Sequence, residues 1–183
     1  ALQALAEGTP HGIPVTVSSD PRHAFLENAG VSFSAKAFSQ WPEPLGLAAL
    51  RDRDAVREFA DIARQEYVAV GIRAALHPTL DLATEPRWYR VHETFTEDAD
   101  LAANIMKTLV EHLQGGPLNP KSPVALTMKH FPGGGPQELG LDPHYAFGKN
   151  QVYPAGNFGW HLKPWKAAID AGIGAIMTFH GFL

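Results

Sequence analysis

The sequence predicts an α/β protein whose most favoured form is a (β/α)8 TIM-type barrel, with about half to two-thirds of the barrel in this chain. Apolar segments of strand length alternate four times with longer segments, and such alternation requires parallel strands joined by crossovers. Polar residues follow each apolar segment, and in a barrel the strand ends surround one pocket. An open doubly wound sheet is the alternative, but ligand groups from so many consecutive strands favour the barrel.

The first strand is predicted over residues 13–19, ending at Asp20. Pro14 suits the beginning of a strand, because proline cannot donate a hydrogen bond in its middle. A long irregular segment is predicted over residues 24–50. A loop of that length inside a compact domain is usually functional.

Apolar residues at helical spacing predict two long helices. Residues 56–67 predict a helix that ends near Gly71 and leads into a strand over residues 72–76. Residues 101–113 predict a second helix, which two following glycines terminate at residues 115–116.

Two further elements complete the predicted pattern. Thr94 and Glu97 have the spacing of a capping box before the second helix. The last helix has its apolar face over residues 162–169, with Pro164 tolerable only in its first turn, and a final strand is predicted over residues 173–178.

The predicted strand over residues 124–131 ends in Lys129 and His130, followed by a proline and three glycines. Neighbouring side chains of a strand face opposite sides, so only a twist or bulge brings both into one pocket. By itself such a pair also fits a surface lysine beside a core histidine. A Walker A loop is excluded because the lysine precedes the glycines. The motif predicts a polar ligand site at a strand end.

Composition excludes several classes of function. The net charge is −4 with acidic and basic residues interspersed, so neither a nucleic-acid partner nor a membrane partner is expected. There is no cysteine, which rules out disulfides and thiolate chemistry. The histidines are scattered without the spacing of a metal motif, so no metal and no cofactor are expected.

Three ordered segments carry a resemblance to a known family. They are Gly-Ile-Pro-Val leading to Ser-Asp at residues 12–20, the Asp-Leu-Ala-Thr-Glu-Pro-Arg-Trp-Tyr-Arg run and its acidic continuation at residues 81–98, and Lys-His-Phe-Pro-Gly at residues 129–133. The chain resembles the N-terminal domain of glycoside hydrolase family 3, although Tyr89 stands where the family has glycine. The resemblance implies a partial TIM-type barrel domain over residues 1–183, cut at both ends.

The resemblance also implies a function and a set of binding residues. The implied protein is a retaining, exo-acting β-glucosidase that hydrolyses terminal non-reducing β-D-glucosyl residues of a β-glucoside or oligosaccharide. Carboxylates accept hydrogen bonds from sugar hydroxyls, while lysine and arginine donate them. The implied sugar-binding residues are Asp20, Arg90, Lys129, His130 and His180.

The family's nucleophile lies in a Ser-Asp-Trp-like motif that the sequence lacks, so the isolated chain is expected to be inactive. A first alternative is the β-N-acetylglucosaminidase branch, in which Asp142 and His144 would form the acid/base pair instead of a structural turn. A second alternative is a noncatalytic sugar-binding fragment. An unclosed barrel exposes strand edges, so self-association is expected.

Overall fold

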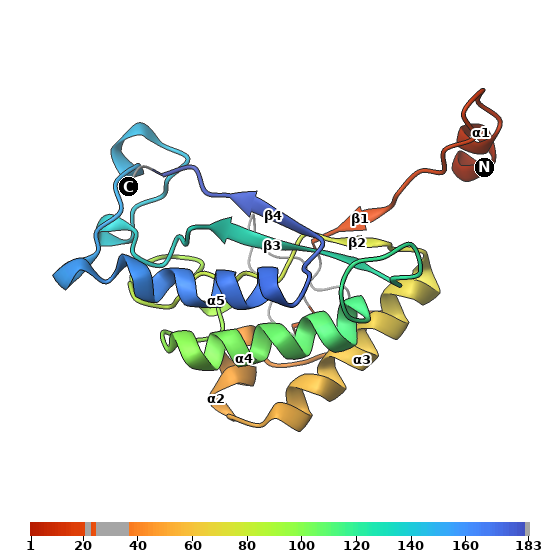
Figure 1. Ribbon diagram of the computed structural model, residues 1–183. Helices are drawn as coiled ribbons and strands as arrows, with labels where there is room; N and C mark the ends of the chain where they lie inside the picture. Colours follow the sequence, from red (N-terminus) through yellow and green to blue (C-terminus); the bar gives the residue numbers. More distant parts are fainter. Residues whose placement is uncertain (21–22, 25–36, 182–183) are drawn as a thin grey trace.

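The computed structural model describes residues 1–20, 23–24 and 37–181 (Figure 1). Its strands form one parallel sheet, in which each strand pairs with the next along the chain. The strands are β1 (Ser18–Ser19), β2 (Ala74–Ala75), β3 (Ala125–Phe131) and β4 (Ala175–Thr178). The helices are α1 (Leu2–Glu7), α2 (Pro44–Ala49), α3 (Arg53–Val70), α4 (Ala99–Leu109) and α5 (Phe158–Asp170), and α4 continues into the π-helical turn η2 (Val110–Gln114).

Helices cover one side of the sheet. In Figure 1, α3, α4 and α5 lie along the same side, with α4 between the other two, while α1 extends away from the sheet. The hydrophobic core fills the space between these helices and β2 and β3. Apart from the projecting α1, Figure 1 shows no helix of the described residues on the opposite side of the sheet, and β4 is largely exposed. This is the arrangement of a barrel wall, with helices outside and the open side facing the interior.

Local signals account for the two long helices. Asp52 caps α3 by accepting hydrogen bonds from the backbone N–H groups of Asp54 and Ala55, and the helix ends at Gly71, whose φ of 84° suits glycine. The predicted helix near these residues is therefore confirmed. The cap predicted for α4 is wrong. The side chain of Asp98, and not that of Thr94 or Glu97, accepts hydrogen bonds from the first N–H groups of that helix.

Gln114, at the end of η2, forms hydrogen bonds near the N-terminal ends of β3 and β4. Its fully buried amide group donates to the carbonyl oxygens of Gly116 and Gly172 at 2.8 and 2.9 Å. Its side-chain oxygen accepts from the N–H groups of Leu126 and Gly174 at 3.2 and 2.9 Å. One side chain thus connects the helix end with β3 and with the start of β4.

The predicted first strand is much longer than the observed one. Of residues 13–19, only Ser18–Ser19 form β1, while Ile13 and Val15 are exposed. A segment becomes a strand only where a partner backbone runs beside it. Within the described residues, that partner is the equally short β2.

Two other predictions need correction. The described part of residues 24–50 is not wholly irregular, because it contains α2; residues 25–36 lie outside the described part. Pro164 lies in the interior of α5, not in its first turn. An interior proline costs about 3 kcal/mol. Burial of Pro164 and its neighbours Trp165 and Ala168 against the core offsets this cost.

Candidate functional site

A cavity of about 220 Å³ lies where the parallel strands end. The side chains that line it come from four separate stretches of the chain: the end of β1, the loop after β2, the end of β3 with its loop, and the end of β4. They include all five predicted sugar-binding residues. The lining residues are Asp20, Trp88, Tyr89, Arg90, Lys129, His130, Pro143, His144, Met177, Phe179 and His180.

A bulge at the end of β3 brings Lys129 and His130 into the same cavity. Lys129 pairs with Met177 of β4, and the next pair joins Phe131 to Thr178, so that His130 is skipped in the register. The sequence predicted that such an irregularity was needed, because consecutive strand residues otherwise face opposite sides.

Lys129 reaches across the cavity to β1. Its ammonium group lies 2.6 Å from Oδ2 of Asp20, and the two residues are 109 positions apart in the chain. The lysine side chain is 4% exposed and the aspartate side chain 47% exposed. The pair thus places a carboxylate that can accept hydrogen bonds at an accessible position of the cavity wall.

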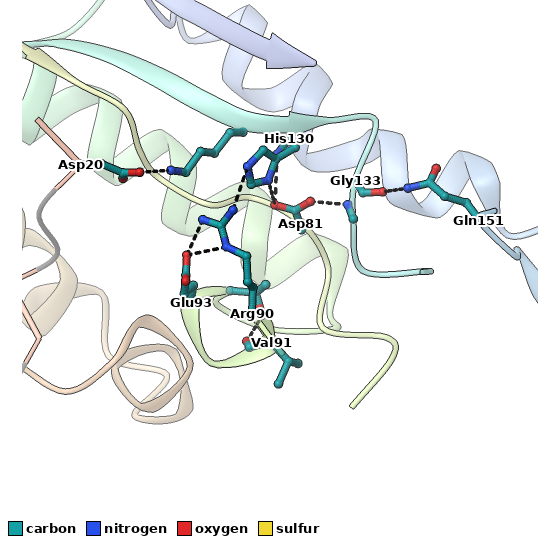
Figure 2. Close-up of polar contacts among 11 residues, drawn as sticks. Asp20, Asp81, Arg90, Val91, Glu93, His130, Gly133 and Gln151 are labelled. Carbon is teal, nitrogen blue, oxygen red and sulfur yellow. Dashed lines mark hydrogen bonds and ion pairs between the residues drawn. The ribbon is translucent and has the colours of Figure 1, made fainter. Parts of the chain in front are cut away.

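Arg90 is held between an acid and an imidazole (Figure 2). Its Nε and Nη2 donate to Oε2 of Glu93 at 3.1 and 2.7 Å, and its Nη1 lies 3.2 Å from Nε2 of His130. Burial alone would lower the pKa of Arg90, but the bonds and charge of Glu93 raise it. The guanidinium therefore remains charged beside the cavity.

Asp81 is a site residue that the sequence analysis did not identify. Its buried carboxylate accepts hydrogen bonds from the N–H groups of His130 and Gly134 (Figure 2). Burial would raise the pKa of Asp81, but the bonds to His130 and Gly134 outweigh burial and lower it. The sequence signal was that Asp81 opens the run at residues 81–98, but that run by itself gives the aspartate no role.

The glycines after β3 allow the loop to pack closely on the site. A Cβ atom on Gly135 would lie 1.6 Å from the carbonyl oxygen of Leu82. One on Gly134 would lie 2.9 Å from the carboxylate of Asp81 and from the ring of Trp88. Any larger residue at either position would push the loop away from the residues that shape the cavity.

Asp142 and His144 form a close pair at the cavity. Oδ1 of Asp142 lies 2.7 Å from Nδ1 of His144 and accepts from its backbone N–H at 3.0 Å. His144 lines the cavity and its ring lies 5.1 Å from that of His180. Partial burial would raise the pKa of Asp142, but its bonds to His144 lower it. The carboxylate thus stays ionised and polarises the imidazole.

Arg87 lies outside the cavity, whereas Trp88 is buried at its wall. Arg87 is exposed and pairs with Glu85 at 2.7 Å, outside the cavity lining. The bonds from Arg87 lower the pKa of Glu85 to about 2. Trp88 is buried, although one side of it borders the cavity.

Within the described ranges, no cluster of three or more histidine, cysteine or acidic side chains has the arrangement of a metal site. Among the same residues, no helix combines the length and apolarity that crossing a membrane requires.

The fold and the cavity define the chain as a parallel α/β domain with a polar ligand site at the carboxyl ends of its strands. The model of the glycosyl hydrolase family 3 N terminal domain matches residues 1–182. The chain therefore belongs to glycoside hydrolase family 3, in the part that corresponds to the N-terminal domain.

Individual relatives agree with this assignment. A protein named probable beta-glucosidase C from Aspergillus flavus is 56% identical over 98% of the chain, which spans 28% of that relative. A periplasmic beta-glucosidase/beta-xylosidase from Dickeya chrysanthemi is 47% identical over 100% of the chain, which again spans 28% of it. The chain is thus less than a third as long as these relatives.

A solved structure gives the same result for the fold. The beta-glucosidase from Listeria innocua in complex with glucose superimposes with a TM-score of 0.80 and 29% identity, covering 99% of this chain and 23% of that one. The predicted α/β fold class is confirmed, with this chain corresponding to only part of a barrel domain.

Proposed function

We propose that this chain is the sugar-binding part of a retaining, exo-acting β-glucosidase that hydrolyses terminal non-reducing β-D-glucosyl residues. The observation that carries the proposal is the convergence of four distant chain segments on a single cavity of about 220 Å³. The names of the relatives, which are beta-glucosidases, support a glucoside as the substrate.

The cavity has the donors and acceptors that a pyranose needs. Asp20 offers an accessible carboxylate that accepts hydrogen bonds from hydroxyl groups, and Lys129 and Arg90 donate only. A hydroxyl group between them donates to the acid and accepts from the cation, which gives it a fixed orientation. We assign sugar binding to these three residues, to His130 and, at the exposed rim, to His180.

The part of the cavity wall that the described residues form does not contain the carboxyl pair that hydrolysis requires. A retaining glycosidase uses two carboxyl groups about 5–5.5 Å apart, one as nucleophile and one as acid/base. Among the described residues that line the cavity, Asp20 alone carries a carboxylate, and this carboxylate is paired with Lys129. We therefore place the nucleophile outside this chain, in the remainder of the parent protein.

Turnover of p-nitrophenyl β-D-glucopyranoside tests this proposal. The full-length parent is expected to release p-nitrophenol. The parent with Lys129→Ala is expected to lose at least about a hundredfold in kcat/KM, because a donor in a dry site stabilises the transition state by about 2.7 kcal/mol or more. The purified 183-residue chain is expected to release none. Turnover by the isolated chain, or a parent without turnover, would contradict the proposal, and the latter would favour a noncatalytic sugar-binding protein.

A second candidate function rests on the Asp142–His144 pair. Its 2.7 Å contact and its position at the cavity fit a histidine acid/base polarised by a carboxylate, as in the β-N-acetylglucosaminidase branch. Comparison of kcat/KM for p-nitrophenyl β-glucoside and p-nitrophenyl β-N-acetylglucosaminide separates the two. We expect a preference for the glucoside; a preference for the acetamido sugar, lost in His144→Ala, would assign the acid/base role to this pair.

A further inference from the structure

Asp81 lies behind the cavity wall and not in it. It is 1% exposed and is not among the residues that line the cavity. Its Oδ2 accepts from the backbone N–H of His130 at 3.0 Å and lies 3.3 Å from Nδ1 of the same residue, while its Oδ1 accepts from the N–H of Gly134 (Figure 2). The hydrogen bonds of Asp81 therefore reach the cavity through His130 and through the glycine turn.

The two neighbours of the His130 ring select the same tautomer. A carboxylate only accepts hydrogen bonds, so Nδ1 must carry the proton where it faces Asp81. A guanidinium only donates, so Nε2 must be unprotonated where it faces Nη1 of Arg90 at 3.2 Å. The ring is thus neutral, with its proton on the side of Asp81.

We propose that Asp81 is a positioning residue that holds His130 in the Nδ1-protonated tautomer, so that Nε2 serves as the acceptor that orients Arg90 in the cavity. This inference rests on the proposed function, because it assumes that Arg90 binds the substrate. The consequence for Arg90 is specific. Of the five N–H donors of an arginine, Glu93 takes two and His130 one, which leaves two for a ligand.

A purely structural role is the competing explanation. Asp81 also holds the turn at Gly134, and loss of that contact alone would loosen the loop. The low pKa of Asp81 supports an ionised carboxylate at neutral pH, which can accept from both sides at once. An asparagine has a single acceptor oxygen, so its amide N–H₂ must face either the donors of His130 or that of Gly134.

The first experiment is Asp81→Asn in the full-length parent. We expect kcat/KM for p-nitrophenyl β-D-glucopyranoside to fall about a hundredfold, the upper range for residues that orient a ligand-binding histidine. The matched control is Asp98→Asn, which also replaces a carboxylate that accepts two backbone N–H groups, at the start of α4. Asparagine caps helices well, so the control should stay within about twofold of wild type.

A double-mutant cycle separates positioning from structure. If Asp81 acts through His130, the Asp81→Asn change should cost less than about threefold in a His130→Gln background, because the ring that it positions is gone. If Asp81 only supports the turn, the full hundredfold loss persists in that background. The persistent loss would overturn the proposal.

Imidazole ¹⁵N chemical shifts provide a readout that does not depend on turnover. The ¹⁵N signals of His130 are assigned by their absence from the spectrum of His130→Gln. In the wild-type parent, these signals should show a protonated Nδ1 and an unprotonated Nε2. Asp81→Asn should move the proton to Nε2 or mix the tautomers. A parent without glucosidase activity would refute the proposed function but leave this measurement decisive, and an unchanged His130 signal in Asp81→Asn would refute the role of Asp81.

Discussion

The charges around the cavity are paired before any ligand arrives. Lys129 is almost fully buried and pairs with the half-exposed Asp20, and Arg90 is largely buried with Glu93. Breaking a buried pair by removing one partner leaves an uncompensated charge, which is strongly destabilising. Substitutions of these residues therefore affect the fold of the site as well as its contacts with a ligand.

At this scale the sequence identified the residues that face the cavity better than those behind it. Asp20, Arg90 and Lys129 belong to motifs that the family resemblance made visible, and the structure brings them together. Asp81 acts 49 positions from His130, and this contact depends on the path of a glycine turn. No local pattern encodes such a contact, so sequence reasoning could not find it.

His161 makes stability depend on pH. It is buried in α5 with its ring 5.1 Å from that of Tyr153, and burial lowers its pKa despite the nearby charge of Asp81. The unfolded chain then binds a proton more readily than the folded one. Stability from this group is complete above the unfolded pKa of about 6.5 and is lost as pH falls toward the folded value.

Thermal unfolding of the parent protein at pH 7.5 and pH 5.5 checks this prediction. The midpoint should fall on acidification, and the fall should be smaller in His161→Gln, which has no titrating ring. Burial also lowers the pKa of His23, which is present in both proteins. The contribution of His161 is therefore the difference between the fall of the midpoint in the wild type and the fall in His161→Gln. Equal falls in both would show that His161 does not contribute.

At the scale of the elements, the long helices and the strand β3 were predictable, whereas the extent of β1 was not. The apolar period of α3 and its terminal glycine are local signals, and both were read correctly. The extent of β1 depends on how far a distant partner runs beside it. The position of Pro164 in α5 depends on how well that helix packs on the core. Neither property is a feature of the segment's own sequence.

Gln114 is the element-scale contact whose loss should cost most. Gln114→Ala leaves the buried N–H group of Leu126 and the partly buried N–H group of Gly174 without their side-chain acceptor, and an unsatisfied buried group costs about 1–3 kcal/mol. We expect a loss of about 2–4 kcal/mol in the free energy of urea unfolding of the parent. Gln65→Ala, which removes an exposed amide, should cost less than about 0.5 kcal/mol. Equal losses would contradict this account of Gln114.

At the scale of the whole molecule, the described sheet is open. β1 and β4 lie at its two edges, and Ile176 of β4 is exposed. Exposed edges and apolar strand faces are templates for pairing with another chain. We predict that the isolated 183-residue chain self-associates, and that a longer parent whose further strands cover these edges does not.

Sedimentation velocity of the purified chain over a range of concentrations measures this directly. The prediction is a sedimentation coefficient that rises with concentration, and a charged substitution at the edge, Ile176→Lys, should reduce the rise. A single monomeric species at all concentrations would contradict the prediction.

The central claim is that distant polar groups converge to hold one sugar. The most direct measurement is a crystal structure of the full-length parent with glucose bound. We predict that a single pyranose occupies the cavity, with its hydroxyl groups within hydrogen-bonding distance of Asp20, Arg90 and Lys129 and with the ring of His130 in contact with the sugar. Glucose bound elsewhere, with these four side chains free of contact with it, would contradict the account.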